Sequence, residues 1–440
     1  MPTENRLRRV LTLWDLIFYG VVLIQPIAPV GIFGLVSKLS HGHASTAILA
    51  AMAAMTLTAW SYGRMAGLYP AAGSAYTYVS HGLNAHLGFL TGWAMFLDYL
   101  IIPVINVIYV ALTFERLVPQ VPYIVWAAVA AGTITLLNLR GIRFAARANE
   151  TLLGVMTVVL VAFVALAVRY LLGRGALWSA QPFYEPHTFD PRALATATSL
   201  AALTYIGFDG VTTLAEEVRD PKRTVPLATV LVCLITGVLS TMEVYLGQRV
   251  WPDWATFPNL ETAFLDVTRR VGGNLLFQAF GVILIVACFG SGLGGQAGAA
   301  RLLYGMGRDG VLPRRLFGYL DPHAGTPTRN ILLIGLLAFG GAVALGYEMA
   351  AELLNFGAFL AFMGVNAAVI REFRRRPGRG AWTWLVLPAL GFLFCAAIWL
   401  SLPVPAKVAG GVWFMAGLIY AAIRTRGFRA QVAPVDFSDS

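Results

Sequence analysis

The sequence predicts an all-helical integral membrane protein with twelve transmembrane helices. Three observations lead to this prediction: the composition, the number of long apolar segments and the distribution of basic residues. Of the 440 residues, 58% are hydrophobic and only 12% are charged, whereas soluble proteins carry roughly 25% charged residues. So few charged residues cannot cover the surface of a soluble globule of this length. The composition therefore excludes a soluble, a disordered and a fibrous protein.

Twelve apolar segments are long enough to cross a bilayer, because a spanning helix needs about 20 mostly apolar residues. The connections between them are short, so we expect no independent soluble domain. In chain order the expected helices cover residues 12–36, 44–62, 84–113, 121–139, 149–170, 194–215, 226–247, 274–298, 329–346, 353–370, 382–401 and 406–423.

The basic residues support both the number of helices and their orientation. When the twelve helices alternate across the membrane, 23 of the 32 Lys and Arg residues fall in loops on one side and nine on the other. Cytoplasmic loops carry the excess of basic residues, so we expect both termini in the cytoplasm. The net charge of +10 is spread over these loops. It forms no continuous basic patch, which argues against a nucleic-acid partner.

Two of the expected helices are interrupted. The 12–36 helix contains Gln25-Pro26-Ile27-Ala28-Pro29-Val30-Gly31, and the 194–215 helix contains Tyr205-Ile206-Gly207-Phe208-Asp209-Gly210. Prolines remove backbone donors and glycines permit unwinding. These are the first and sixth helices, at matching positions of two five-helix halves, which is the pattern of an inverted-repeat secondary transporter. Frequent proline and glycine in membrane helices is the alternative explanation.

This pattern predicts a division of the chain into four parts. Residues 1–170 form the first five-helix repeat and residues 171–193 an external loop. Residues 194–372 form the second, inverted repeat, and residues 373–440 hold the last two helices and a cytoplasmic tail. No phosphate-binding loop of the Walker type occurs in the sequence, so transport would be secondary or passive.

Three carboxylates lie well inside expected helices: Asp98, Asp209 and Glu243. A charge at this depth is costly, and no Lys or Arg lies at mid-membrane depth in the expected helices as a partner. Each acid must therefore be protonated, hydrogen-bonded, solvated or paired with a transported cation. Asp209 is the leading candidate for substrate or proton binding because it lies inside a helix break. Asp98 and Glu243 are further candidates for proton coupling, although Glu243 is expected near the external interface.

Other candidate substrate-binding residues surround these acids. The first break offers backbone groups and one amide side chain, at Gln25, Ala28 and Gly31, and the second offers Tyr205 and Gly207. Tyr99 and Tyr109 share the 84–113 helix with Asp98, and Ser291 lies in the small-residue stretch Gly290–Gly295. Ordinary interhelical packing and hydrogen bonding are the alternative role for the polar groups and the glycines.

The sequence gives little support for other function classes. The three cysteines, Cys233, Cys288 and Cys395, are widely spaced in apolar segments, so we expect no metal site and no disulfide framework. Neither a zinc-protease nor a serine-hydrolase motif occurs, and we expect no enzyme and no cofactor. An ion channel remains an alternative, although a channel would more naturally show a repeated filter motif.

Five motifs resemble those of the amino acid–polyamine–organocation permeases, and most of all the bacterial putrescine importers. The similarity runs over about residues 10–375. The motifs are Tyr69-Pro70-Ala71-Ala72-Gly73-Ser74-Ala75-Tyr76-Thr77-Tyr78; Gly92-Trp93 with Leu97-Asp98-Tyr99; Phe208-Asp209-Gly210-Val211-Thr212-Thr213-Leu214-Ala215-Glu216-Glu217; Arg301-Leu302-Leu303-Tyr304-Gly305-Met306-Gly307-Arg308-Asp309-Gly310; and Asn355-Phe356-Gly357-Ala358-Phe359.

The resemblance implies a LeuT-like fold of two inverted five-helix repeats with two added helices. It implies uptake of an amino acid or a polyamine such as putrescine across the bacterial inner membrane, driven by protons or sodium, with protons favoured. It places substrate between the two breaks, beside the third and eighth helices. The sixth-helix acid of the family falls on Asp209, and the Asp-Tyr pair of the putrescine branch falls on Asp98 and Tyr99.

Two departures leave the substrate open. Amino acid permeases of the family usually carry Gly-x-Gly in the first break, where this chain has Pro29-Val30-Gly31, and proline has no amide hydrogen. The putrescine branch often has an extra acid in this stretch, where this chain has Gly31. A neutral amino acid permease or exchanger is therefore the first alternative. A non-transporting ligand sensor or a channel is the second.

Overall fold

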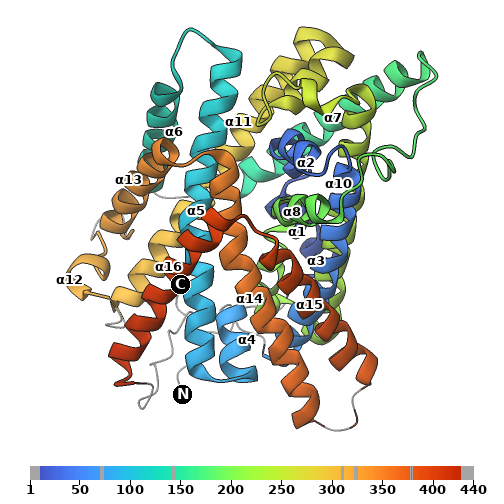
Figure 1. The fold of residues 1–440 in the computed structure, drawn as a ribbon. Helices are drawn as coiled ribbons and strands as arrows, with labels where there is room; N and C mark the ends of the chain where they lie inside the picture. The colour runs from blue at the N-terminus through green and yellow to red at the C-terminus, as the bar shows by residue number, and fades with distance from the viewer. Residues whose placement is uncertain are drawn as a thin grey trace.

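The computed structural model describes residues 10–69, 74–140, 145–308, 312–321, 326–376, 378 and 380–427. In these residues the regular elements are helices, and one isolated bridge joins Leu11 to Val218. The long helices stand side by side in a single bundle (Figure 1). Ten of the described helices are long and apolar enough to cross a membrane, and two shorter apolar helices bring the number to twelve.

The twelve expected spans are all present. The first consists of α1 (Leu13–Ile24), the 3₁₀ segment η1 (Ala28–Gly31) and α2 (Phe33–Leu39). The sixth consists of α8 (Pro191–Ala201), η2 (Ala202–Tyr205), α9 (Gly210–Thr213) and η3 (Ala215–Glu217). The other spans are α3 (Ala44–Leu68), α5 (Ala85–Leu117), α6 (Tyr123–Leu139), α7 (Ala145–Leu172), α10 (Pro221–Val250), α11 (Ala263–Arg308), α13 (Thr328–Ala344), α14 (Tyr347–Arg375), the π segment η5 (Trp382–Val386) with α15 (Leu387–Leu400), and α16 (Val404–Arg424).

Several helix boundaries differ from those expected. The short helices α4 (Ser74–Gly82) and α12 (Arg314–Phe317) lie in stretches expected to be loops. The stretch 248–273, between two of the expected helices, contains η4 (Trp254–Thr256) and the first part of α11, which is kinked at Gly273, where φ is 64°. α14 begins at Tyr347 rather than at residue 353, which brings Glu348 and Glu352 into the helix.

The expectation that the basic residues lie in loops is wrong for many of them, because the helices are longer than expected. Arg301 and Arg308 lie in the last turns of α11, and Arg116 lies at the end of α5. Arg64 lies within α3, where its guanidinium stacks 4.5 Å from the ring centroid of Trp60 and 5.2 Å from that of Trp384. These positions remain close to helix ends, so the charge asymmetry between the two sides is preserved.

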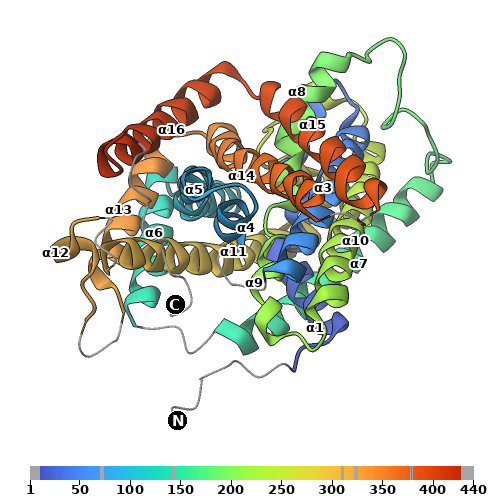
Figure 2. The ribbon, with the colours of Figure 1, turned by 90° about the horizontal axis from the view of Figure 1, so that it is seen from below.

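The two broken spans belong to one part of the bundle. In Figure 2, α1, α3, α7, α9 and α10 lie together on one side, α6, α12 and α13 lie on the opposite side, and α5 and α14 lie between them. α3 and α10 pack closely, since a Cβ on Gly63 would lie 2.9 Å from the Cβ of Pro226. Small residues permit such close helix approach in membranes. The inverted relationship of the two halves stays a prediction.

Candidate functional site

The structure brings the two helix breaks into contact. α1 ends at Ile24 and is followed by Gln25, which has φ 72° and ψ 128°. In the sixth span, η2 is followed by extended backbone at Ile206 and by Gly207 with φ 115°. A Cβ on Gly207 would lie 3.5 Å from Leu23 Cγ and 3.6 Å from Ile24 Cγ1. A positive φ of this size favours glycine. The unwound backbones of the first and sixth spans therefore lie side by side within the bundle.

The first break uses most of its own backbone donors. The amide groups of Ala28, Val30 and Ile32 donate to carbonyl oxygens three residues earlier, at 3.1, 3.1 and 3.2 Å. Pro26 and Pro29 have no amide hydrogen. Few amides are left to hold a substrate carboxylate. The side chain of Gln25 is also engaged, since its Nε2 donates to the carbonyl oxygen of Ala287 in α11 at 3.0 Å.

Gly31 packs against two tyrosines. A Cβ at this position would lie 2.6 Å from the Tyr347 hydroxyl and 3.2 Å from Tyr109 Cζ, and the two rings have centroids 5.1 Å apart. The buried Tyr109 hydroxyl has no hydrogen-bond partner among the described residues. Tyr347 was not predicted as part of the site, because the expected tenth helix began six residues later. No sequence signal marks it.

Asp209 immediately precedes α9 at the second break. Its Oδ2 accepts a hydrogen bond from Ser74 Oγ at 3.4 Å, and its carbonyl oxygen accepts one from Thr212 Oγ1 at 2.6 Å. Ser74 has φ 45° and is the first residue of α4. The sequence motif around Tyr69–Tyr78 is therefore in contact with the acid of the second break. Its residues 70–73 lie outside the described part of the chain.

Asp98 and Tyr99 lie on α5 and join this group. Asp98 is 8% exposed, its Oδ1 has no partner in the described part of the chain, and it is close enough to Asp209 for the two charges to interact. Tyr99 interacts electrostatically with both acids and lies against Gly298 of α11, whose Cβ would be 3.3 Å from its ring. The structure thus brings together Asp98, Tyr99 and Asp209.

Two other candidates have their side chains engaged elsewhere. The Tyr205 hydroxyl donates to the carbonyl oxygen of Ile48 in α3 at 2.9 Å, so only its backbone faces the break. Ser291 Oγ accepts from Asn106 Nδ2 at 3.0 Å, within the contact between α5 and α11. These hydrogen bonds match the packing role that the sequence left open for such residues.

Glu243 lies deeper than expected. The sequence placed it near the external interface, but its side chain is fully buried in α10. Neither carboxylate oxygen has a hydrogen-bond or ion-pair partner among the described residues. A buried charge without a partner costs several kcal/mol, so this carboxyl needs a proton, a bound cation or solvent to be stable.

Three further buried acids, Asp266, Glu352 and Glu372, were not among the predicted site residues. Glu352 in α14 is 3% exposed and its Oε1 has no partner in the described ranges. It lies one turn after Glu348, and Glu348 also acts electrostatically on Glu261 in the connection that follows α10. Burial, opposed by a hydrogen bond from the backbone of Tyr347 and supported by the charge of Glu348, raises the pKa of Glu261. Glu261, Glu348 and Glu352 lie on the Tyr347 side of Gly31.

The described residues contain no cluster of three or more His, Cys, Asp or Glu side chains that could hold a metal ion. The groups available at the breaks are two carboxylates, the phenols of Tyr99, Tyr109 and Tyr347, and unwound backbone. Such a set binds ammonium groups and protons.

Comparisons with known proteins agree with this arrangement. The sequence profile of the family described as amino acid permease matches residues 11–424. The low-affinity putrescine importer PlaP of Escherichia coli K12 is 36% identical over 98% of this chain and 97% of its own. The branched-chain amino acid permease BcaP of Lactococcus lactis is 26% identical, with 96% of each chain covered.

The fold also has a solved counterpart. The crystal structure of MhsT in complex with L-phenylalanine matches with a TM-score of 0.56 and 13% identity, and it covers 95% of this chain and 100% of its own. At this identity the likeness concerns the fold alone, and it confirms the expected LeuT-like architecture. Together with the profile match and the relative that is 36% identical, the observations show that this chain belongs to the amino acid permease family of membrane transporters.

Proposed function

We propose that this chain is a secondary transporter that imports a small amine-bearing solute by alternating access, with putrescine as the first candidate. The observation that carries the proposal is the placement of Asp98 on α5 close to Asp209 at the second break, with no ion-pair partner for either in the described part of the chain. A buried carboxylate needs a compensating positive charge or a proton. An ammonium group of the substrate supplies that charge, and a diamine supplies one for each acid.

The backbone of the first break favours an amine over a carboxylate. Its prolines lack amide hydrogens, and the amides of Ala28, Val30 and Ile32 already donate within the break. Carbonyl oxygens at such a break attract cations, whereas free amides attract carboxylates. The identity to a putrescine importer over almost the whole chain points in the same direction.

Acids near Tyr347 also suit a cationic substrate. Glu261, Glu348 and Glu352 lie close enough for their charges to interact, and the Tyr347 backbone that donates to Glu261 adjoins the tyrosine pair over Gly31. Like charges that converge on an entrance raise the local concentration of a ligand of opposite charge. This acidic approach would guide an ammonium group toward Tyr109, Tyr347 and the first break.

Coupling to protons is the second part of the proposal. Glu243 carries the coupling proton, because its buried carboxyl has no cation to balance a negative charge among the described residues. Asp98 and Asp209 exchange between protonated and substrate-bound states during the cycle. Both termini are in the cytoplasm of a bacterial cell and the protein lies in the inner membrane, as the excess of basic residues on one side suggests.

Each of the two five-helix repeats, residues 1–170 and 194–372, supplies one moving span and two spans of the fixed part. The α1 and α8–α9 spans tilt against α5, α6, α11 and α13, and the fixed site at the two breaks opens to one side at a time. Gln25 crosses this boundary through its hydrogen bond to Ala287. We expect that bond to break or rearrange when α1 tilts relative to α11.

A neutral or branched-chain amino acid is the second candidate substrate. It is favoured by one observation, the absence of an acid at Gly31, and by the identity to a branched-chain amino acid permease. In this case one carboxylate of the Asp98–Asp209 pair would bind the single ammonium group of the amino acid.

Uptake by purified protein in proteoliposomes tests the proposal. Labelled putrescine is offered with an inward proton gradient, with an inward sodium gradient or with neither, and competed by unlabelled diamines and amino acids. Accumulation that needs the proton gradient and is blocked by diamines supports the proposal. Accumulation that needs sodium would overturn the choice of coupling ion. No putrescine uptake in vesicles that exchange leucine would favour the second candidate.

A further inference from the structure

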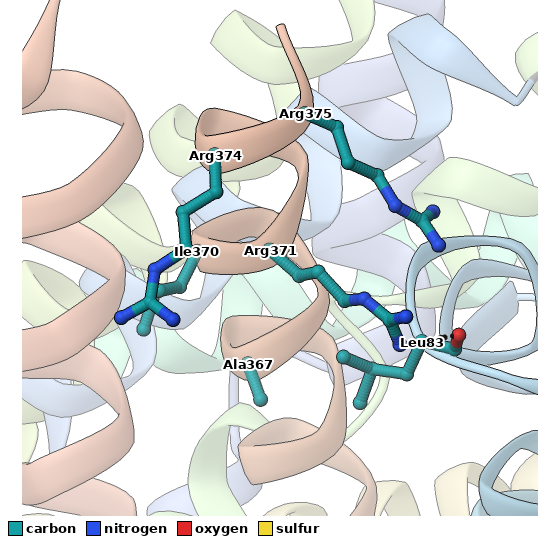
Figure 3. A pocket seen from close by; sticks show the side chains of 6 residues that line it. All are labelled: Leu83, Ala367, Ile370, Arg371, Arg374 and Arg375. Carbon is teal, nitrogen blue, oxygen red and sulfur yellow. Dashed lines mark hydrogen bonds between the residues drawn. The ribbon is translucent and has the colours of Figure 1, made fainter.

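A hollow outside the transport site carries unbalanced positive charge. It has a volume of about 570 Å³ and lies between the end of α14 and the connection from α4 to α5. Figure 3 shows three arginines extending from α14 around it, with Arg371 directed toward Leu83. The hollow is lined by Leu83, Ala367, Ile370, Arg371, Arg374 and Arg375.

The charges around the hollow do not cancel. The buried carboxylate of Glu372 pairs with Arg375 at 3.3 Å and with Arg376 at 2.9 Å. Arg371 donates to the carbonyl oxygen of Leu83 at 2.6 Å, which leaves its charge uncompensated. Arg374 makes no hydrogen bond or ion pair with any described residue. Two guanidinium groups at the hollow therefore lack an anionic partner in the described part of the chain.

The rest of the lining is apolar. Ala367 and Ile370 on α14 and Leu83 at the end of α4 are half-buried and offer methyl groups below the guanidinium rim. The exposed Trp382 follows α14 after a short connection, and tryptophans of this kind concentrate at the membrane interface. A dissolved anion gains nothing from the methyl groups. A phospholipid would contact them with its glycerol and first methylenes while its phosphate meets the arginines.

We propose that this hollow binds the headgroup of an anionic phospholipid, such as phosphatidylglycerol. Guanidinium groups bind phosphate through charge-assisted, often paired hydrogen bonds, and each Arg near a membrane surface adds to the attraction for anionic lipid. Arg374 and Arg371 supply the donors, and the side chains of Ile370, Ala367 and Leu83 receive the start of the acyl chains. The proposal depends on membrane insertion and is independent of which solute is transported.

The position of the hollow connects it to the transport site. Arg371 and Arg375 donate to carbonyl oxygens at the end of α4, those of Leu83 and His81. The first residue of the same short helix, Ser74, donates to Asp209. A headgroup that fixes the arginines of α14 against α4 would therefore stabilise the α4 contact with the second break.

Lipid-dependent thermal stability of the full chain tests the proposal. Purified protein in detergent is titrated with short-chain phosphatidylglycerol, with phosphatidylcholine of the same chain length, or with inorganic phosphate. Phosphatidylglycerol should raise the melting temperature in a saturable way. The Arg374→Gln variant should need about fivefold more lipid for half of the effect, the amount expected for loss of one interfacial arginine. Arg374 has no partner among the described residues, so this variant should fold normally.

A matched control separates this site from general surface charge. Arg315 in α12 is also exposed at the end of a helix and its guanidinium has no hydrogen bond or ion pair with described residues. Arg315→Gln should leave the titration unchanged. The proposal is overturned if Arg315→Gln and Arg374→Gln weaken the effect equally, if phosphatidylcholine stabilises as well as phosphatidylglycerol, or if inorganic phosphate alone gives the full stabilisation.

Discussion

Ser74 and Asp209, 135 residues apart in the sequence, are joined by a hydrogen bond of 3.4 Å from Ser74 Oγ to Asp209 Oδ2. The bond connects the first residue of α4 to the break in the sixth span. It is one of few protein contacts that the Asp209 carboxylate makes, and it leaves the negative charge without a cation. In our proposal, the ammonium group of the substrate binds this carboxylate and supplies the missing positive charge.

Asp209→Asn should lower uptake more than Ser74→Ala. The asparagine variant removes a charge-assisted hydrogen bond to the ammonium group, worth about 1.5–3 kcal/mol, which corresponds to a loss of affinity of roughly tenfold or more. Ser74→Ala removes one long hydrogen bond of 3.4 Å to the carboxylate and no direct contact with the ammonium group, so it should cost less. Concentration dependence of uptake in proteoliposomes measures both. Equal effects of the two changes would mean that Asp209 acts only as a partner of Ser74.

Gly31→Ala should destabilise the protein, and Tyr347→Phe should restore part of the loss. The new Cβ would lie 2.6 Å from the Tyr347 hydroxyl, and overpacking of this kind costs about 1–3 kcal/mol. Removal of the hydroxyl in the double variant relieves the closest contact. Melting temperatures of the single and double variants check this. If Tyr347→Phe lowers stability by the same amount in the wild type and in the Gly31→Ala variant, the two positions do not interact.

Glu243→Gln should separate exchange from accumulation. Glutamine imitates the protonated carboxyl, so folding and binding should be retained, but it cannot release a proton. We expect counterflow of labelled substrate at close to the wild-type rate and loss of accumulation driven by a proton gradient. Both assays use the same vesicles. Accumulation that remains dependent on the proton gradient in Glu243→Gln would assign coupling to Asp98 or Asp209 instead.

Glu261→Gln should change stability in a pH-dependent way. Burial first, and the charge of Glu348 as well, raise the pKa of this carboxyl above its ordinary value of 4.5. The folded protein therefore holds a proton more readily than the unfolded chain does, and the ionised form costs stability as pH rises through the raised pKa. The variant should melt higher than the wild type at pH 7 and at the same temperature below about pH 4. A difference in melting temperature between variant and wild type that stays constant over this pH range would contradict the raised pKa of Glu261 as the cause.

The helices were predictable because each apolar segment is long and most basic residues fall on one side of the membrane when the segments alternate across it. The pairing of the breaks was predictable from two prolines and two glycines at matching positions. Helix ends were harder, because Glu348 and Glu352 lower the local hydropathy although Glu352 is buried in the folded bundle. α4 was missed because its nine residues mix polar and apolar side chains without a long apolar run.

The sequence predicted which residues form the core of the candidate site, but it did not predict which residues contact one another there. Asp98, Tyr99 and Asp209 are marked by their chemistry and by the family motifs. Sequence spacing cannot show that Ser74 reaches Asp209 or that Tyr347 covers Gly31, since both contacts join segments more than 100 residues apart. Nor can it show that Tyr205 directs its hydroxyl to the α3 backbone. These relationships depend on how the helices pack.

Direct binding of labelled putrescine to purified wild-type protein and to the Asp98→Asn/Asp209→Asn double variant is the most direct test of the central claim. Both carboxylates become neutral amides of nearly the same size, so the fold should be preserved, which the melting temperature verifies. We predict saturable binding to the wild type that diamines displace, and a loss of affinity of at least about a hundredfold in the double variant. Binding of putrescine to the double variant with wild-type affinity would contradict the claim that these two acids hold the substrate.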